Sequence, residues 1–233
     1  MAKPLFLDFD GVIADSIEEC FVISSQVYYG FTSATSDLNR SRHDLFYQHR
    51  GLVHPPWEYC ALHRTIEKTL ATGSADFSAL FHTVKETMSQ KEKTSFEHLF
   101  FSLRRHYQSD FATWSAMNPA TEFGTFLSGR AVKHLYIVTT KNEDAVKNLL
   151  AHYRITVTDI FSHAHYNQYG CKGKLISAIL DRHNLHEAIF IDDAVEHLDS
   201  VTDPRVQCYF ADWGYGENND YPLFHKQLWE GIA

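Results

Sequence analysis

The stretch that most restricts the fold lies near the N-terminus, where a short apolar run ends in two acidic residues. Residues 5–7 are continuously apolar, which is typical of a strand covered on both faces. In an extended chain residues i and i+2 point to the same side, so Asp8 and Asp10 can face one site beyond the strand's carboxyl end. Gly11 lets the chain turn there. Two close carboxylates repel each other, and a hard divalent cation such as Mg²⁺ relieves the repulsion.

Strand-like runs and helical patterns alternate after residue 118. We predict strands over residues 135–138, near 160–161, and over 188–191 and 206–210. Predicted helices cover about 120–128, a stretch opened by Asn142, about 173–183 and 194–201, whereas residues 163–170 are predicted to be a polar loop. Strands that alternate with helices indicate right-handed βαβ units and a parallel sheet.

The segment between the first strand and residue 118 has a different character. It shows no convincing strand, and we predict a helix starting at Asp15-Ser16 and further helices at about 40–49, 56–71, 75–90 and 94–113. The predicted fold class is therefore α/β, with a Rossmann-like parallel-sheet core formed by residues 1–13 and 118–233. An all-helical cap, residues 14–117, is inserted after the first strand.

Composition limits the classes of function. A hydrophobic content of 44% suits a folded protein, and no apolar run has the length of a membrane span or of a secretory signal. The four cysteines are scattered, which favours reduced thiols in a cytoplasmic protein. A net charge of −8 without a basic tract argues against nucleic acid as the main partner. We therefore expect a cytoplasmic protein whose partner is neither a membrane nor nucleic acid.

Polar residues follow three of the predicted strands. Taken alone, Asp8 and Asp10 also fit a plain turn cap, because Asp is common where a strand enters a loop. However, Thr139 and the pair Asp192-Asp193 also end strands, and a lysine, Lys172, precedes the strand that carries the last pair. The carboxyl ends of parallel strands share one edge of a sheet. Carboxylates, a hydroxyl and an ammonium group at one edge would bind Mg²⁺ and a phosphate together.

These residues resemble the four motifs of the haloacid dehalogenase (HAD) superfamily, in its phosphatase branch with a helical cap of the first type. The resemblance covers the whole predicted core and is nearest to phosphoglycolate-phosphatase-like and β-phosphoglucomutase-like enzymes. The matching segments, in the expected order, are Asp8-Phe9-Asp10-Gly11-Val12, Ile137-Val138-Thr139, Lys172 and Ile191-Asp192-Asp193.

The resemblance implies a role for each matching residue. Asp8 would be the nucleophile that takes the phosphoryl group, and Asp10 would protonate the leaving oxygen and later deprotonate the attacking water. Thr139 would hydrogen-bond the phosphoryl oxygens, and Lys172 would stabilise their charge. Asp8, the Asp10 carbonyl and Asp193 would hold Mg²⁺, with Asp192 supporting the ion directly or through water.

Two departures from the family pattern leave alternatives. Lys174 stands two residues after Lys172 and could take its role, although Lys172 is preferred because it precedes the helix expected from residue 173. His197 stands where relatives often have Asp or Asn, which puts metal binding from that position in doubt.

The cap would carry the substrate specificity. A basic cluster near Gly51 either binds an anionic group of the substrate or is a solvated face, and Arg42 is its preferred member. Thr140, beside Thr139, is the second predicted substrate-binding residue. The aromatic residues of this region are expected to form cap core: Trp57, Tyr59, Phe96, Phe100 and Phe101.

The sequence therefore predicts a Mg²⁺-dependent HAD phosphohydrolase that removes phosphate from a small phosphorylated metabolite through an aspartyl-phosphate. A phosphotransferase such as a sugar-phosphate mutase is the alternative within enzymes. A catalytically inactive HAD-fold binding protein is the alternative of another class, but such a protein has no need of a second acid at Asp10.

Overall fold

A computed structural model shows that the chain folds into two compact units. The structure describes residues 3–30, 37–73, 75–218 and 220–231. The first unit, called the core, comprises Met1–Ser16 and Asn118–Ala233, and the second, called the helical unit, is Ile17–Met117. The change from one unit to the other falls after residue 16, whereas the sequence pattern placed it after residue 13.

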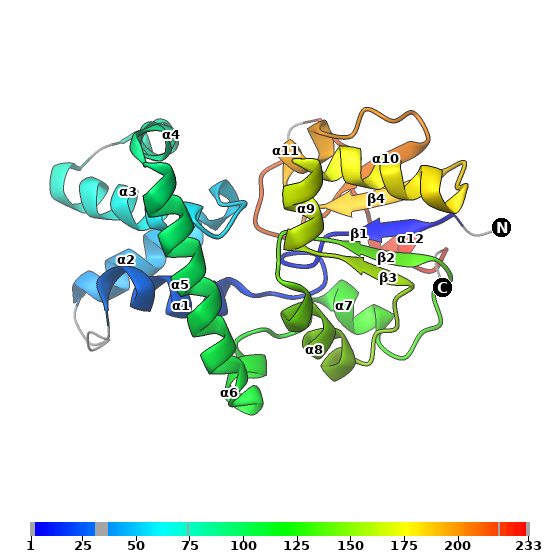
Figure 1. Ribbon diagram of the computed structural model, residues 1–233, viewed down its shortest axis with the longest axis horizontal. Helices are drawn as coiled ribbons and strands as arrows, with labels where there is room; N and C mark the ends of the chain where they lie inside the picture. The colour runs from blue at the N-terminus through cyan, green and yellow to red at the C-terminus, as the bar shows by residue number, and fades with distance from the viewer. Residues whose placement is uncertain (1–2, 31–36, 74, 219, 232–233) are drawn as a thin grey trace. The chain divides into compact units, whose positions relative to one another are not determined.

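The core is built on one parallel sheet, drawn as arrows in Figure 1. Within the described residues the sheet has five strands in the order β3-β2-β1-β4-β5, which confirms the predicted α/β class. The strands are β1 (Leu5–Leu7), β2 (Leu135–Val138), β3 (Asp159–Phe161), β4 (Ala188–Asp192) and β5 (Val206–Phe210).

Strand β1 lies in the middle of this sheet and pairs on both sides. Leu5 is in register with Leu135 of β2 and with Ile189 of β4. All three residues of β1 are buried, which explains why its sequence is apolar without alternation. The Phe6 ring stacks on Tyr136 of β2 with centroids 4.9 Å apart.

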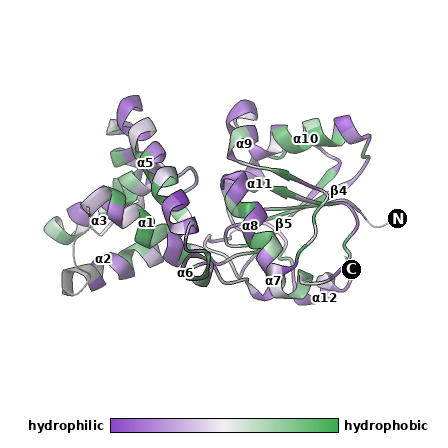
Figure 2. Ribbon diagram, turned by 60° about the horizontal axis from the view of Figure 1, so that its bottom comes forward, coloured by the Kyte–Doolittle hydropathy of each residue, from purple (hydrophilic) through white to green (hydrophobic). Residues whose placement is uncertain are grey.

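Helices cover both faces of the sheet, with α9, α10 and α11 on one side and α7 and α8 on the other (Figure 1). Helix α10 places Leu175, Ile176 and Ile179 in the cluster that also contains Phe6 and Phe190 of the sheet. The helices of the core are α7 (Glu122–Leu127), α8 (Glu143–Tyr153), α9 (His163–Tyr169), α10 (Lys172–His183), α11 (Val195–Asp199) and α12 (Lys226–Trp229). Figure 2 shows both colours along α10, as expected of an amphipathic helix.

The prediction of a polar loop over residues 163–170 is wrong, because this segment forms helix α9. Its sequence lacks apolar periodicity, and none of its residues is buried. The ends carry the signal instead. The backbone N–H of Ser162 donates to Nδ1 of His165 (3.2 Å), and Gly170 ends the helix with φ of 80°.

The helical unit contains one long helix that the sequence pattern placed too late. Helix α5 ends at Gln108, and Asp110 then caps a separate helix by accepting from the backbone N–H of Thr113 (3.3 Å). The single helix predicted over 94–113 is therefore two helices. The elements of this unit are α1 (Ile17–Tyr29), α2 (Asp37–Gln48), the 3₁₀ helix η1 (Arg50–Leu52), α3 (Glu58–Thr72), α4 (Phe77–Thr87), α5 (Gln90–Gln108) and α6 (Phe111–Ala116).

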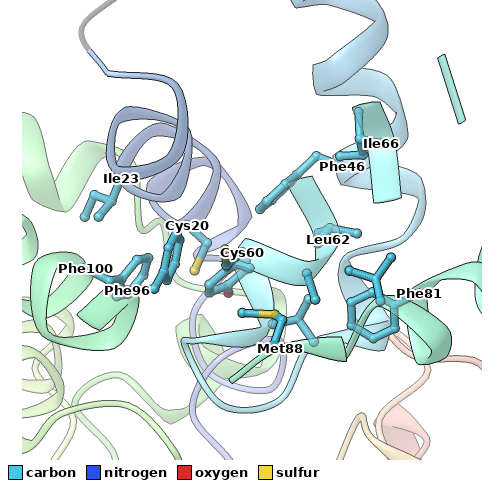
Figure 3. Packing of buried hydrophobic residues seen from close by; sticks show 14 of the residues in the cluster. Cys20, Ile23, Phe46, Cys60, Leu62, Ile66, Phe81, Met88, Phe96 and Phe100 are labelled. Atoms are coloured by element: carbon cyan, nitrogen blue, oxygen red, sulfur yellow. The ribbon is translucent and has the colours of Figure 1, made fainter. Parts of the chain in front are cut away.

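The helical unit has its own hydrophobic core, shown in Figure 3. Phe46, Phe81 and Phe100 are fully buried there. The aromatic residues expected in the cap core lie in it: Tyr59, Phe96 and Phe100 are buried, and Trp57 and Phe101 pack against them. A closed apolar core of this kind explains why the unit is compact by itself.

No helix of the described residues combines the length and the apolar character that crossing a membrane requires.

A buried ion pair joins three helices of this unit. Glu19 of α1 accepts two bonds from the guanidinium of Arg104 on α5, at 2.6 and 2.8 Å. The same carboxylate accepts from the indole Nε1 of Trp114 on α6 at 3.1 Å. Because Glu19 is fully buried, its charge depends on these partners for stabilisation.

Helix α3 of the same unit carries a buried histidine, His63. Nε2 of His63 is 2.8 Å from Oγ of Ser24, and no hydrogen-bond partner for its Nδ1 occurs within the described residues. Burial, together with the positive charge of Arg42, lowers the pKa of His63 from 6.5 to about 3. The imidazole is therefore neutral in the folded protein at neutral pH.

We expect Glu19→Gln to lower the free energy of unfolding by about 3–5 kcal/mol, because it leaves the Arg104 guanidinium buried without a counter-charge. Urea denaturation followed by tryptophan fluorescence measures this loss. The matched control is Glu143→Gln, which breaks an exposed pair with Lys147 (2.5 Å) and should cost less than about 1 kcal/mol. Equal effects of the two substitutions would contradict the assigned importance of the buried pair.

We also expect His63 to make stability depend on pH. Its pKa is lower in the folded than in the unfolded state, so below about pH 6.5 the unfolded chain binds more protons and stability falls as the pH drops. Between about pH 7.5 and about pH 5, the free energy of unfolding should fall about 2 kcal/mol less in His63→Gln than in the wild type. The exposed His98, changed to Gln, serves as control and should leave the pH dependence unchanged.

Candidate active site

The candidate site begins where β1 and β4 end side by side. The backbone N–H of Asp8 donates to the carbonyl of Ile191 at 3.0 Å, which continues the pairing of the two strands by one residue. Asp8 and Asp192 therefore leave neighbouring strands at the same edge of the sheet. Both side chains are buried.

The ammonium group of Lys172 bridges these two carboxylates. Its Nζ lies 2.9 Å from Oδ1 of Asp8 and 2.8 Å from Oδ2 of Asp192. Lys172 is the first residue of α10 and is fully buried, whereas Lys174 is exposed. Of the two lysines considered from the sequence, Lys172 is therefore the one that the fold brings to the acidic residues.

Burial and charge act on these groups in opposite directions. Burial favours the neutral form of Lys172, but the carboxylates of Asp192 and Asp8 outweigh it and raise the pKa of the lysine. Burial also disfavours the charged form of Asp192, but the Lys172 ammonium outweighs it and lowers the pKa of that carboxyl. The pKa of Asp8 is raised, chiefly by burial.

His197 lies against the same cluster. Its Nδ1 is 3.2 Å from Oδ1 of Asp192, which also accepts from the backbone N–H of Ala194 at 2.9 Å. One ligand atom each of Asp8, Asp192 and His197 lie within 4.8 Å of one another. The sequence comparison treated His197 as a departure from the family pattern, and the structure places it beside Asp192.

Asp10 is held by two donors. The hydroxyl of Ser16 and the Nζ of Lys141 (3.0 Å) both donate to its Oδ1. The side chain of Lys141 is fully buried. Sequence reasoning missed Lys141, and its position two residues after Thr139, at the same strand end, was the available signal.

Thr139 follows β2 at the same edge. It is buried, its backbone N–H donates to Phe161 of β3 at 2.9 Å, and its Oγ1 accepts from the backbone N–H of Lys141 at 3.1 Å. Thr140 comes next and is half-buried. The turn after β2 therefore carries both threonines and the lysine that contacts Asp10.

Asp193 packs closely against two glycines. A Cβ at Gly11 would be 2.2 Å from Oδ2 of Asp193, and one at Gly214 would be 2.2 Å from its Cβ. The backbone N–H of Tyr215 donates to Oδ2 of Asp193 at 2.6 Å. The carboxylate of Asp193 is therefore next to the Asp10-Gly11 segment, and larger residues at either glycine would displace it.

The donor set fits a divalent metal ion. The site has four carboxylates and two ammonium groups, so negative charge is in excess. The carboxylates are hard oxygen ligands of the kind that Mg²⁺ prefers. The groups counted are the carboxylates of Asp8, Asp10, Asp192 and Asp193 and the ammonium groups of Lys141 and Lys172.

Arg42, the predicted substrate-binding residue of the cap, belongs to the helical unit. Its guanidinium binds Glu67 through Nε at 2.6 Å and through a terminal nitrogen at 3.1 Å, and it stacks over the Tyr29 ring at 4.4 Å from the centroid. Its charge is thus partly neutralised inside the unit. A role in substrate binding stays a prediction.

No protein-family model matches this sequence, and no curated protein matches it significantly. Solved structures do match over nearly the whole chain. One is a haloacid dehalogenase-like family hydrolase from Streptococcus pneumoniae, with 19% identity, a TM-score of 0.58 and coverage of 96% of this chain and 94% of that chain.

Two further matches carry phosphatase names. A predicted phosphatase from Clostridium acetobutylicum has 15% identity and a TM-score of 0.60 over 100% of this chain and 98% of that chain. A predicted phosphoglycolate phosphatase from Haemophilus somnus has 10% identity and a TM-score of 0.61 over 94% and 89% of the two chains. At these identities the likeness establishes the fold, which is the HAD-like fold that the four motifs implied.

We expect Lys172→Met to destabilise the core by about 3–5 kcal/mol, because it leaves the carboxylates of Asp8 and Asp192 buried without the ammonium that bridges them. Lys174→Met, at the exposed neighbouring position, should change stability by less than about 0.5 kcal/mol. Chemical denaturation of the two variants in parallel measures both effects. A larger loss in Lys174→Met would transfer the bridging role to that lysine.

Proposed function

We propose that this protein is a Mg²⁺-dependent phosphohydrolase that removes phosphate from a small phosphorylated metabolite through an aspartyl-phosphate on Asp8. The observation that carries the proposal is the contact of the Asp8 carboxylate with the buried Lys172 ammonium. Asp8 is also followed, two residues later, by a second acid, Asp10. The fold shared with HAD-like hydrolases supports the same reading, since it puts these residues at the ligand-binding edge of the sheet.

In the proposed reaction, a carboxylate oxygen of Asp8 attacks the phosphorus atom and the bond to the leaving oxygen breaks. Asp10 gives its proton to that oxygen, and the alcohol departs. Asp10 then takes a proton from a water molecule, whose oxygen attacks the phosphorus; the bond between phosphorus and the Asp8 oxygen breaks, which releases inorganic phosphate and restores the Asp8 carboxylate. Asp10 follows Asp8 by two residues in the sequence, which supports its proposed role as the proton carrier.

The remaining polar groups would stabilise the phosphoryl charge. Lys172 is in contact with Asp8, so its ammonium would also lie near oxygens of a phosphoryl group attached there. Thr139 and Thr140, on the turn after the adjacent strand β2, would donate hydrogen bonds to the same oxygens. Phosphoryl transfer depends on such positioning and charge neutralisation.

Mg²⁺, when bound, would neutralise charge on the phosphate and on Asp8. Asp8, the Asp10 carbonyl and Asp193 would hold it. Both carboxylate oxygens of Asp192 already have partners in Lys172, Ala194 and His197, which favours an indirect contribution from this residue. The contact of His197 Nδ1 with Oδ1 of Asp192 would help to hold the Asp192 carboxylate in its orientation.

The negative net charge of the chain favours a small phosphate ester as the substrate class. A net charge of −8 is unfavourable for nucleic acid, so a small phosphate ester that the two ammonium groups and the metal can neutralise is the better candidate. A cytoplasmic location and Arg42 as a ligand for a second anionic group of the substrate stay predictions.

The test is phosphate release from a panel of phosphorylated metabolites. We expect Mg²⁺-dependent turnover that EDTA removes and that Asp8→Asn lowers on the order of 10³-fold or more, because the nucleophile is lost. Asp220→Asn, at an exposed position, is the control and should be as active as the wild type. Turnover that survives in Asp8→Asn would contradict the mechanism, and an inactive wild type that still binds Mg²⁺ would favour a transferase or a binding protein.

A further inference from the structure

The loop of residues 213–216 contacts Asp193, a proposed metal ligand, and also the segment that follows Asp10, the proposed proton carrier. Tyr215 is its central residue. The tyrosine's backbone N–H donates to Oδ2 of Asp193 at 2.6 Å, and its hydroxyl reaches the segment that follows Asp10.

The hydroxyl of Tyr215 both accepts and donates, and the carbonyl of Ala14 is a second, longer acceptor at 3.5 Å. It accepts from the backbone N–H of Ser16 at 2.7 Å and donates to Oδ1 of Asp15 at 3.1 Å. Ser16 is fully buried, so its N–H gains a partner that solvent does not supply. The tyrosine thus holds the backbone at the last residues of the core before the chain enters the helical unit at Ile17.

Ser16 in turn contacts the proposed proton carrier, because its hydroxyl donates to Oδ1 of Asp10. Lys141 donates to the same oxygen, so two donors fix the rotation of the Asp10 carboxylate. Ser16 therefore links Tyr215 to Asp10 through two hydrogen bonds, one made by its backbone N–H and one by its side-chain hydroxyl.

The loop itself is held tightly against the core. The indole Nε1 of Trp213 donates to the carbonyl of Val12 at 3.0 Å. Gly214 lies against the Asp193 side chain, and a Cβ at Gly216 would be 2.0 Å from the Asp193 carbonyl oxygen. Such close packing holds the backbone of the loop that carries Tyr215, which suits a residue that positions others.

We propose that the hydroxyl of Tyr215 is a positioning group that holds Ser16, and through it the carboxylate of Asp10, in the orientation for proton transfer. This inference rests on the proposed phosphohydrolase function. Tyr215 does not touch the reacting atoms in this scheme, and its backbone bond to Asp193 is independent of its hydroxyl.

The test is Tyr215→Phe, which removes the hydroxyl but keeps the ring and the backbone N–H that binds Asp193. We expect kcat to fall on the order of tenfold to a hundredfold, with KM and the Mg²⁺ concentration for half-activation nearly unchanged, because a misplaced acid slows the chemical step. Tyr221→Phe is the matched control, since it removes a hydroxyl that donates to Asp199 (2.7 Å) outside the site.

The leaving group separates a positioning role from general damage. The loss in kcat/KM of Tyr215→Phe should be larger for the best alkyl phosphate of the panel than for p-nitrophenyl phosphate, whose leaving group departs without a proton. Equal losses for both substrates, or a loss no larger than that of Tyr221→Phe, would overturn the inference while the phosphohydrolase function stands.

A second readout does not need activity. Amide hydrogen exchange of Ser16, measured by NMR, should be faster in Tyr215→Phe than in the wild type or in Tyr221→Phe, because the N–H loses its acceptor. Unchanged exchange would overturn the inference even in an active enzyme. A wild type that releases no phosphate would instead overturn the proposed function and, with it, the catalytic part of this inference.

Discussion

The ammonium group of Lys172 between the carboxylates of Asp8 and Asp192 is the contact on which the rest of the core depends. It joins the end of β1, the end of β4 and the start of α10, and all three side chains are buried. Two carboxylates alone could not stay buried there, and neither could the lysine. The sheet edge therefore holds its charged groups only as a set, and stability and proposed chemistry depend on the same atoms.

The sequence was most informative where the local pattern alone determines the environment of a residue, as in a buried strand or at the start of a helix. The apolar run of β1 predicted a strand covered on both faces, which its burial confirms, and the preference for Lys172 over Lys174 followed from the expected start of α10. It was least informative where tertiary contacts decide. Lys141 looks like an ordinary surface lysine until the fold brings Asp10 to it. Helix α9 is set by its end residues because it has no buried face that periodicity could reveal.

The helical unit and the core solve the problem of buried polarity in different ways. In the helical unit, Glu19 is neutralised by Arg104 and His63 stays uncharged, so the buried polar groups pair within the unit. In the core, the four carboxylates of the candidate site exceed its two ammonium groups, and Gly11 and Gly214 pack closely against Asp193. An excess of buried negative charge is unfavourable for stability alone, and is understandable where a metal ion and a phosphate are to be bound.

The central place of β1 in the sheet has a consequence for folding during synthesis. Strand β1 pairs with β2 through Leu135 and with β4 through Ile189, and both of these strands are synthesised much later than β1. The helical unit is formed by residues 17–117 alone, so it can fold while the remainder of the chain is still being translated. We therefore expect the inserted unit to fold first, and β1 to wait, apolar and unpaired, until most of the chain has been made. During that interval it is the segment of the nascent chain that most needs protection from aggregation.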